Sequence, residues 1–239
     1  MNKIITIENL HSFCYLNDDK VLSNPKGLIV EFIGLGGQRM FTSYDAANIY
    51  SEHNILFMVP YINPWNWMND QAIQEVNELI EVVKEKYQMP SLKVASTGGS
   101  MGGMSALTYS AYAKEVPAIV VANCPVCDLE YHYTERPDLP RTMYSAFYDA
   151  NSPKDLQDVL KEHSPLRLAE AHKLPETKYV IFHAECDSQV NIHKHTEKLL
   201  EVMNKQYDVE FTRVPNKDHC GLDEAAAAHY REVLLDTFK

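Results

Sequence analysis

The stretch of sequence that decides the fold is residues 93–107, KVASTGGSMGGMSAL. A short apolar run breaks into glycines around one serine, and apolar residues then resume at helical spacing. The stretch therefore predicts a strand, a sharp turn and a helix. Residues 98–102 (GGSMG) fit the G-x-S-x-G nucleophile elbow, in which small residues let the chain turn tightly enough to expose the serine hydroxyl. We thus predict that Ser100 is a nucleophile in a cleft.

Short β-branched runs alternate with amphipathic segments along the rest of the chain. This pattern is typical of a mostly parallel sheet covered by helices on both faces. The first 24 residues lack helical spacing and are predicted to form two antiparallel strands at the sheet edge. We expect one α/β domain over residues 1–239 with about eight strands. The predicted central strands are 28–33, 55–59, 92–95, 118–122, 179–184 and 209–214.

Charge and composition narrow the partners and the compartment. The chain has 33 acidic and 22 basic residues and a formal charge of −11. Its field repels phosphate groups, so we expect neither nucleic acid nor a membrane as a partner. The sequence offers no signal peptide and no apolar run near transmembrane length. Its five cysteines are scattered and odd in number, which fits reduced thiols in a cytoplasmic protein. The sequence is compatible with a homo-oligomer as well as with a monomer.

A second glycine-rich turn, FIGLGGQ at residues 32–38, follows the first central strand. Glycines let backbone amides approach a ligand closely. A dinucleotide fingerprint requires a third glycine where Arg39 stands, so we expect no nucleotide cofactor. The other interpretation of this turn is one half of an oxyanion hole.

Two further segments are predicted to shape a pocket. Trp65 and Trp67 lie in a loop after the second central strand, where they either wall a substrate pocket or close the core, and we expect one in each role. From Asp128 to His163 the βα alternation lapses in a tyrosine-rich segment that follows the sixth predicted strand. Such excursions are usually lids or binding loops, so we predict a lid insertion at 128–163; the alternative is local packing of its tyrosines.

The cysteines are predicted to carry no chemistry. Cys124 and Cys127 have C-x-x-C spacing, but a zinc site would need a second pair of ligands at similar spacing. A thioredoxin-like site would lie at a helix start near the first βαβ unit, not after a late strand. Cys186 and Cys220 are interpreted as packing thiols, so we expect no metal.

Most of the ten histidines are also assigned structural roles. His183 should be buried at the end of its strand, whereas His193 and His195 are expected to be solvated. The others, apart from His219, lack a partner motif: His11, His53, His132, His163, His172 and His229.

Three motifs together resemble α/β hydrolases of the group related to dienelactone hydrolases and the catalytic domains of prolyl oligopeptidases. They are the elbow, the turn HAECDSQV at 183–190, similar to that group's HGxxDxxV pattern, and Asp218-His219 before the last helix. Their order Ser, Asp, His, each after a predicted strand, is that of the α/β hydrolases. The resemblance covers about residues 28–239 and implies a serine hydrolase with the α/β hydrolase fold.

The resemblance implies a catalytic triad. Ser100 would attack a carbonyl carbon, His219 would take its proton and return it to the leaving group, and Asp187 would orient the imidazole. Glu185 and Asp218 are neighbouring carboxylates, and either could in principle take the place of Asp187.

The resemblance also implies an oxyanion hole made of backbone amides. Met101, directly after the nucleophile, should supply one amide and Leu35 the other, with Gly36 as the alternative to Leu35. The chain has Ile33-Gly34 where the group commonly has His-Gly, which leaves the backbone donor in place. Residues 36, 65 and 67 are the predicted substrate contacts.

The predicted function is a carboxylesterase that cleaves a small or medium carboxylic ester through an acyl-enzyme, without metal or cofactor. An ester is preferred because oligopeptidases of this resemblance usually carry a large additional domain, for which 239 residues leave no room. A peptidase or amidase of small substrates is the nearest alternative. A non-catalytic binding protein on a hydrolase scaffold is another.

Overall fold

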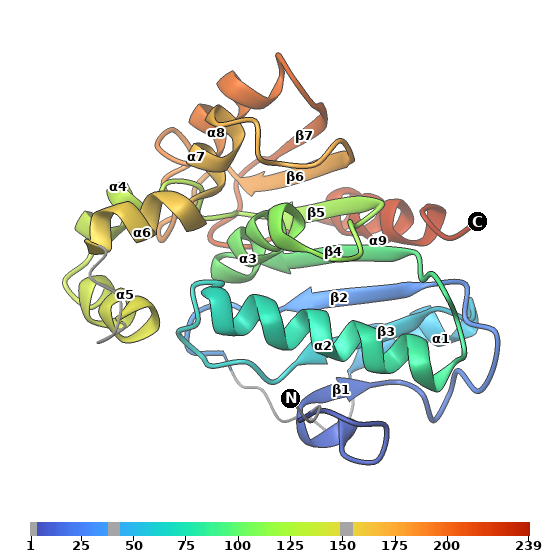
Figure 1. The fold of residues 1–239 in the computed structure, drawn as a ribbon. Helices are drawn as coiled ribbons and strands as arrows, with labels where there is room; N and C mark the ends of the chain where they lie inside the picture. The colour runs from blue at the N-terminus through green and yellow to red at the C-terminus, as the bar shows by residue number, and fades with distance from the viewer. Residues whose placement is uncertain (1–3, 38–43, 149–154) are drawn as a thin grey trace.

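The computed structural model describes residues 4–37, 44–148 and 155–239. Strands in this part of the chain form one seven-stranded sheet in the order β1-β3-β2-β4-β5-β6-β7 (Figure 1). Strand β1 pairs antiparallel with β3, and all other neighbours are parallel, as the sequence predicts. The strands are β1 Cys14–Leu16, β2 Leu28–Phe32, β3 Leu56–Pro60, β4 Val94–Gly99, β5 Ile119–Asn123, β6 Lys178–Ala184 and β7 Asp208–Val214.

The N-terminal segment differs from the expectation of two edge strands. Within residues 4–24 only β1 forms, preceded by the 3-10 helix η1, Leu10–Ser12. The buried side chain of Asn17 ends β1, because its Oδ1 accepts the Phe57 N–H at 2.7 Å and its Nδ2 donates to the Ile55 carbonyl at 3.2 Å. The excursion at 128–163 therefore follows the fifth strand of the described chain rather than the sixth.

Helices cover both faces of the sheet. Side chains alternate along β2, so Leu28 and Val30 pack toward α2 and α3, and Ile29 packs toward α1 and α9. None of the described helices is both long and apolar enough to span a membrane. The covering helices are α1 Asp45–Glu52, α2 Asp70–Lys86, α3 Met101–Tyr112, α7 Pro165–Glu170, α8 Thr196–Met203 and α9 Glu224–Asp236.

The predicted lid segment is helical. It contains α4 Leu129–Glu135, α5 Leu139–Phe147 and α6 Leu156–His163, with residues 149–154 outside the described part. These helices lie beyond the carboxyl ends of the central strands (Figure 1). Two side chains of the loop before α2 reach α5: Trp67 Nε1 donates to Thr142 Oγ1 at 3.0 Å, and Asn69 Nδ2 donates to the Ala146 carbonyl at 2.6 Å. The segment is thus fixed over the edge where parallel strands present a site.

Candidate active site

The elbow places Ser100 in the sharp turn between β4 and α3. Ser100 has φ 59° and ψ −125°, a conformation that is disfavoured for a residue with a Cβ atom. The flanking glycines allow the close approach to β2 that this turn needs. A Cβ atom would lie 2.6 Å from the Phe32 carbonyl oxygen if placed on Gly98, and 2.1 Å if placed on Gly102. The strand, turn and helix predicted from residues 93–107 are therefore confirmed.

Asp187 is the carboxylate that contacts the ring of His219. His219 Nδ1 donates to the two Asp187 carboxylate oxygens at 2.8 and 2.9 Å. Asp187 Oδ1 also accepts the backbone N–H groups of Gln189 and Val190, each at 2.8 Å. These bonds fix the carboxylate, which in turn fixes the direction of the imidazole.

The two alternative carboxylates lie elsewhere. Asp218 Oδ1 accepts the backbone N–H of Ser188 at 2.9 Å and that of His219 at 2.7 Å. Glu185 Oε2 accepts the Asn216 N–H at 3.3 Å. Among the described residues, neither carboxylate bonds to the ring of His219, so the geometry favours Asp187.

The electrostatics of this pair follow from its contacts. Burial raises the pKa of Asp187, but hydrogen bonds from His183 and His219 outweigh it, so the pKa lies well below its usual range. Burial lowers the pKa of His219, but the hydrogen bond to Asp187 and the neighbouring Cys220 outweigh it and raise the pKa above its ordinary value. The pKa of Cys220 falls to about 5, mainly because the Cys124 thiol donates to its sulfur, against the effect of burial.

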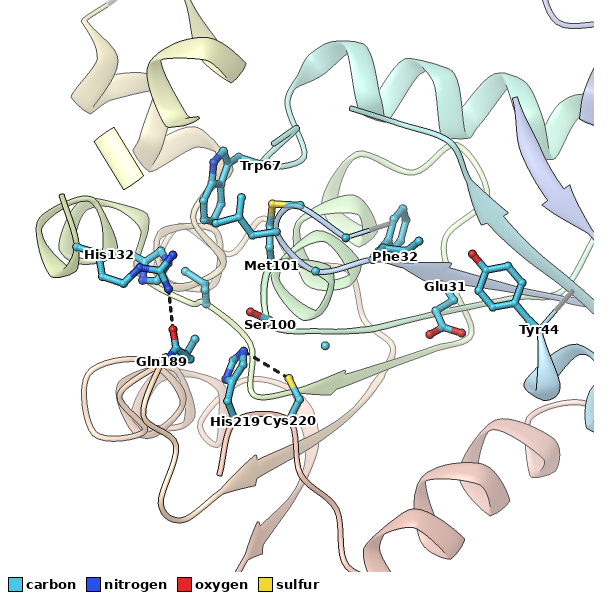
Figure 2. A pocket seen from close by; sticks show the side chains of 18 residues that line it. Glu31, Phe32, Tyr44, Trp67, Ser100, Met101, His132, Gln189, His219 and Cys220 are labelled. Atoms are coloured by element: carbon cyan, nitrogen blue, oxygen red, sulfur yellow. Dashed lines mark hydrogen bonds between the residues drawn. The ribbon is translucent and has the colours of Figure 1, made fainter. Parts of the chain in front are cut away.

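Ser100 and His219 line one cavity of about 620 Å³ (Figure 2). Their side chains form no hydrogen bond with each other in the described structure, and His219 Nε2 instead lies 3.7 Å from Cys220 Sγ. Catalytic hydrogen bonds are often long in a free enzyme and tighten only when substrate binds. The cavity thus brings a serine, an imidazole and a carboxylate together in the predicted order.

Two residues that line this cavity have backbone N–H groups with no acceptor among the described residues. Met101 is the first residue of α3, so its N–H has no partner inside the helix. Leu35 also lines the cavity, and its N–H donates to no other described residue. The alternative donor Gly36 is unsuitable, because its N–H already donates to the Pro64 carbonyl at 3.0 Å.

The two tryptophans differ in position. Trp67 is fully buried and also lines the cavity, so it combines the two expected roles. Trp65 is 45% exposed, and neither it nor Gly36 belongs to the cavity wall. The Trp65 indole instead covers the glycine turn, with Nε1 4.0 Å from where a Cβ on Gly36 would lie. The substrate contacts predicted for residues 36 and 65 are therefore not supported by their placement.

A buried polar cluster on the lid segment was missed by sequence reasoning. His195, expected to be solvated, is fully buried, and its Nε2 bonds to Glu135 Oε2 at 2.9 Å. His132 Nδ1 bonds to the same oxygen at 2.5 Å. The i,i+3 spacing of His132 and Glu135 on one helix was a usable signal. His195 lies 60 residues away from Glu135, so no local spacing in the sequence could indicate this contact.

This cluster has a definite proton arrangement. The N–H groups of Cys127 and Asp128 donate to His195 Nδ1 at 3.1 and 3.3 Å, so neutral His195 carries its proton on Nε2. Burial lowers the pKa of His132 and keeps it neutral. Although burial alone would raise the pKa of Glu135, the two histidines lower it to about 2. The result is a carboxylate held between two neutral imidazoles, with His132 in the cavity wall.

The cysteines also depart from expectation. Cys186 is exposed, and Cys220 lines the cavity, so they are not both packing thiols. Within the C-x-x-C motif the thiols have different partners. Cys127 Sγ donates to the Pro125 carbonyl at 3.3 Å, while Cys124 Sγ accepts the N–H groups of Ala184 and Cys220, both at 3.3 Å. Cys124 is thus a cysteine that contacts Cys220.

Comparisons with known proteins agree with this geometry. Residues 64–238 match the prolyl oligopeptidase family, and no curated protein matches significantly. A Mycobacterium tuberculosis puromycin-hydrolyzing peptidase superposes with a TM-score of 0.72 at 14% identity, over 90% of this chain and 34% of that chain. An S-formylglutathione hydrolase from Agrobacterium tumefaciens gives 0.65 at 15% identity, over 92% and 86% of the two chains. Esterase B from Lactobacillus Rhamnosis gives 0.68 at 12% identity, over 90% and 76%.

These structural likenesses establish the fold, which is that of α/β hydrolases. The chain spans about a third of the length of the puromycin-hydrolyzing peptidases that it matches. The family match covers residues 64–238 and includes the elbow, the 183–190 turn and His219. The chain belongs to the prolyl oligopeptidase family.

Proposed function

We propose that the protein is a carboxylesterase that cleaves small or medium esters, with Ser100 as nucleophile, His219 as general base and acid, and Asp187 as the orienting carboxylate. The observation that carries the proposal is the strained Ser100, which shares a cavity with an imidazole bonded to a buried carboxylate. Residues held in such backbone conformations cluster at active sites.

The reaction follows from this arrangement. Ser100 Oγ attacks the ester carbonyl carbon while His219 Nε2 takes the hydroxyl proton. The developing oxyanion accepts hydrogen bonds from the N–H groups of Met101 and Leu35. The ester C–O bond then breaks, the alcohol leaves with the proton from Nε2, and the acyl group stays on Ser100. Water repeats the sequence, releasing the acid and restoring the serine.

The size of the cavity supports a small substrate. Its volume of about 620 Å³ lies within the range of small-molecule sites. Arg136, which directly follows α4, donates from Nη1 to Gln189 Oε1 at 2.8 Å and so joins the lid segment to the turn that carries Asp187 (Figure 2). This bridge narrows one side of the cavity, where an extended polypeptide would need an open groove.

A peptidase or amidase of small substrates is the second candidate. The matched family is one of oligopeptidases, and the Mycobacterium tuberculosis neighbour is named a puromycin-hydrolyzing peptidase. An ester and an anilide with the same acyl group separate the two candidates. We expect a kcat/KM for the ester that exceeds that for the anilide by several orders of magnitude, and similar values would favour the amidase.

A fluorophosphonate probe tests the serine directly. We expect a covalent adduct at Ser100 in the folded protein and none in the Ser100→Ala variant. An unlabelled wild-type protein with normal circular dichroism would contradict the hydrolase mechanism and favour a binding protein.

A further inference from the structure

Two thiols that the proposed reaction does not use lie beside its imidazole. Cys220 directly follows His219, and its Sγ lies 3.7 Å from His219 Nε2. Cys124, just after β5, accepts the Cys220 N–H on its sulfur at 3.3 Å. One ligand atom from each of these three residues lies within 4.8 Å of the other two. A soft, nitrogen-containing donor set is thus assembled at the cavity wall.

The donor set has the chemistry of a zinc site. Two thiolates and one imidazole suit Zn²⁺, and three protein ligands leave a fourth position open. Usual Zn–S and Zn–N bond lengths imply a sulfur-to-nitrogen separation of about 3.6 Å across a tetrahedral ion. The observed 3.7 Å between Cys220 Sγ and His219 Nε2 is close to this value.

The surroundings of the donors support metal binding. His219 donates its other nitrogen, Nδ1, to Asp187 at 2.8 Å, which is the carboxylate–histidine arrangement usual behind metal ligands. Cys124 Sγ accepts two backbone N–H groups, which fix the position of the sulfur. Cys124 and Cys220 have φ 45° and 57°, backbone conformations that residues other than glycine rarely adopt and that mark functional sites when they occur.

In two other polar clusters of the described chain, a histidine nitrogen that a metal ion would need is already protonated and hydrogen-bonded. In the cluster of His132, Glu135 and His195, His195 accepts two amides on Nδ1 and therefore carries a proton on Nε2, where a metal would bind. In the cluster of Cys124, His183 and Asp187, His183 Nε2 donates to the Val190 carbonyl at 3.1 Å. His219 Nε2, by contrast, bonds to no oxygen acceptor in the described structure, so a metal can take that position.

We propose that Cys124, Cys220 and His219 bind one Zn²⁺ ion and that the ion inhibits hydrolysis. Zinc binds through two thiolates and the Nε2 lone pair, and the protons that these groups held pass to solvent. While the metal occupies Nε2, the imidazole cannot take the proton of Ser100. The metal site stands independently, and only the inhibition rests on the proposed hydrolase function.

Metal binding is tested without substrate. The full-length protein is freed of metal under a phosphine reductant, and ZnCl₂ is titrated in competition with a chromophoric chelator. We expect one Zn²⁺ per chain and at least a tenfold loss of affinity in Cys220→Ser and Cys124→Ser, since outer-shell changes alone cost 10- to 100-fold. Cys186→Ser changes an exposed thiol outside the cluster and is the matched control, with unchanged affinity.

A second measurement does not require the Cys124→Ser variant, which changes a buried thiol, to fold. Co²⁺ replaces Zn²⁺, and thiolate-to-cobalt charge-transfer absorption is expected in the wild type and in Cys186→Ser. The absorption should weaken in Cys220→Ser, whose side chain lies at the cavity wall. Wild-type protein without stoichiometric zinc, or Cys220→Ser with wild-type affinity and absorption, would overturn the site.

Inhibition is measured separately on the ester. We expect stoichiometric Zn²⁺ to inhibit the wild type and Cys186→Ser, EDTA to restore the rate, and Cys220→Ser to need at least tenfold more zinc for the same inhibition. Zinc that binds at the cluster yet leaves an active enzyme uninhibited would contradict the inhibitory role. A metal-free protein that turns over no ester refutes the proposed function instead, and the binding titration still decides the site.

Discussion

Each of the two sides of the cavity holds a carboxylate bonded to imidazole, but the surroundings of these groups differ between the two sides. On the elbow side, defined by Ser100, Asp187 and His219, a carboxylate fixes an imidazole beside a nucleophile. On the lid side, His132 and His195 share the carboxylate of Glu135.

The surroundings decide what each pair can do. The lid-side imidazoles contact aromatic rings, with His132 5.6 Å from Trp67 and His195 5.6 Å from Tyr131 between ring centroids. No serine hydroxyl or cysteine thiol bonds to their ring nitrogens among the described residues, whereas His219 faces Ser100 across the cavity and has a thiol near its Nε2. A carboxylate–imidazole pair therefore indicates catalysis only where a reactive group faces the imidazole. We therefore expect the elbow side to control rate and the lid side to control stability.

The largest difference should come from the nucleophile. Ser100→Ala is expected to lower kcat for the ester on the order of 10⁶-fold, because a catalytic triad acts as a unit. Ser105→Ala, in the first turns of α3, removes a buried hydroxyl that has no partner in the described structure and should leave kcat unchanged. Equal activity of the two variants would show that Ser100 on the elbow side does not control the rate.

The orienting carboxylate should give the next largest effect. Asp187→Asn is expected to lower kcat on the order of 10⁴-fold, since an amide no longer holds the required tautomer of the imidazole. Asp218→Asn should cost less than tenfold, because Asp218 bonds to backbone amides and not to the ring. A reversed order in steady-state kinetics would make Asp218 the functional acid.

On the lid side, Glu135→Gln should change stability. The two histidines lower the Glu135 pKa from 4.5 to about 2 despite its burial. Its stabilisation of the folded state, about 3 kcal/mol, is therefore complete above pH 4.5 and lost as the pH falls toward 2. Urea unfolding should show a variant less stable than wild type at pH 7 and a smaller difference at pH 3.

The control for this prediction lies on the same helix. Glu130 bonds to Arg167 at 2.7 Å at the surface, so Glu130→Gln should cost less than about 1 kcal/mol. A Glu135→Gln variant with wild-type stability at pH 7, or with a rate reduced as far as that of Asp187→Asn, would show that the lid side is not mainly structural.

The smallest effect concerns the attachment of the lid. Thr142→Val leaves the Trp67 N–H without its acceptor and should lower the free energy of unfolding by about 1–2 kcal/mol. Thr134→Val removes an exposed hydroxyl that, in the described part of the chain, bonds only to the Tyr131 carbonyl, so it should change stability less. Thermal unfolding of both variants, monitored by tryptophan fluorescence, measures the contrast.

The sequence predicts the elbow side well because its residues follow the ends of parallel strands. Such ends meet at one edge of a sheet, so the predicted strands and the resemblance of the three motifs together could bring Ser100, Asp187 and His219 to one place. The lid side depends on His195, which reaches Glu135 from the turn before α8, and no local pattern reports that contact. Cys124 reaches Cys220 across 96 residues in the same way.

The N-terminal edge and the glycine turn were also beyond local patterns. A single buried side chain, Asn17, decides where β1 ends, because it bonds to the backbone of the neighbouring strand. Likewise, the choice of Leu35 over Gly36 as the free amide depends on the carbonyl of Pro64, 28 residues further along the chain.

The position of His195 has a consequence for recombination between relatives. Residues 128–163 look like a module that could be exchanged to alter substrate range, but the carboxylate that they bury is completed from outside that module. In a chimaera whose imported lid has another residue at position 135, the buried His195 N–H would lose its acceptor. If position 195 were exchanged instead, the Glu135 carboxylate would lose one of its two donors. Viable lid exchanges should therefore carry position 195 with them.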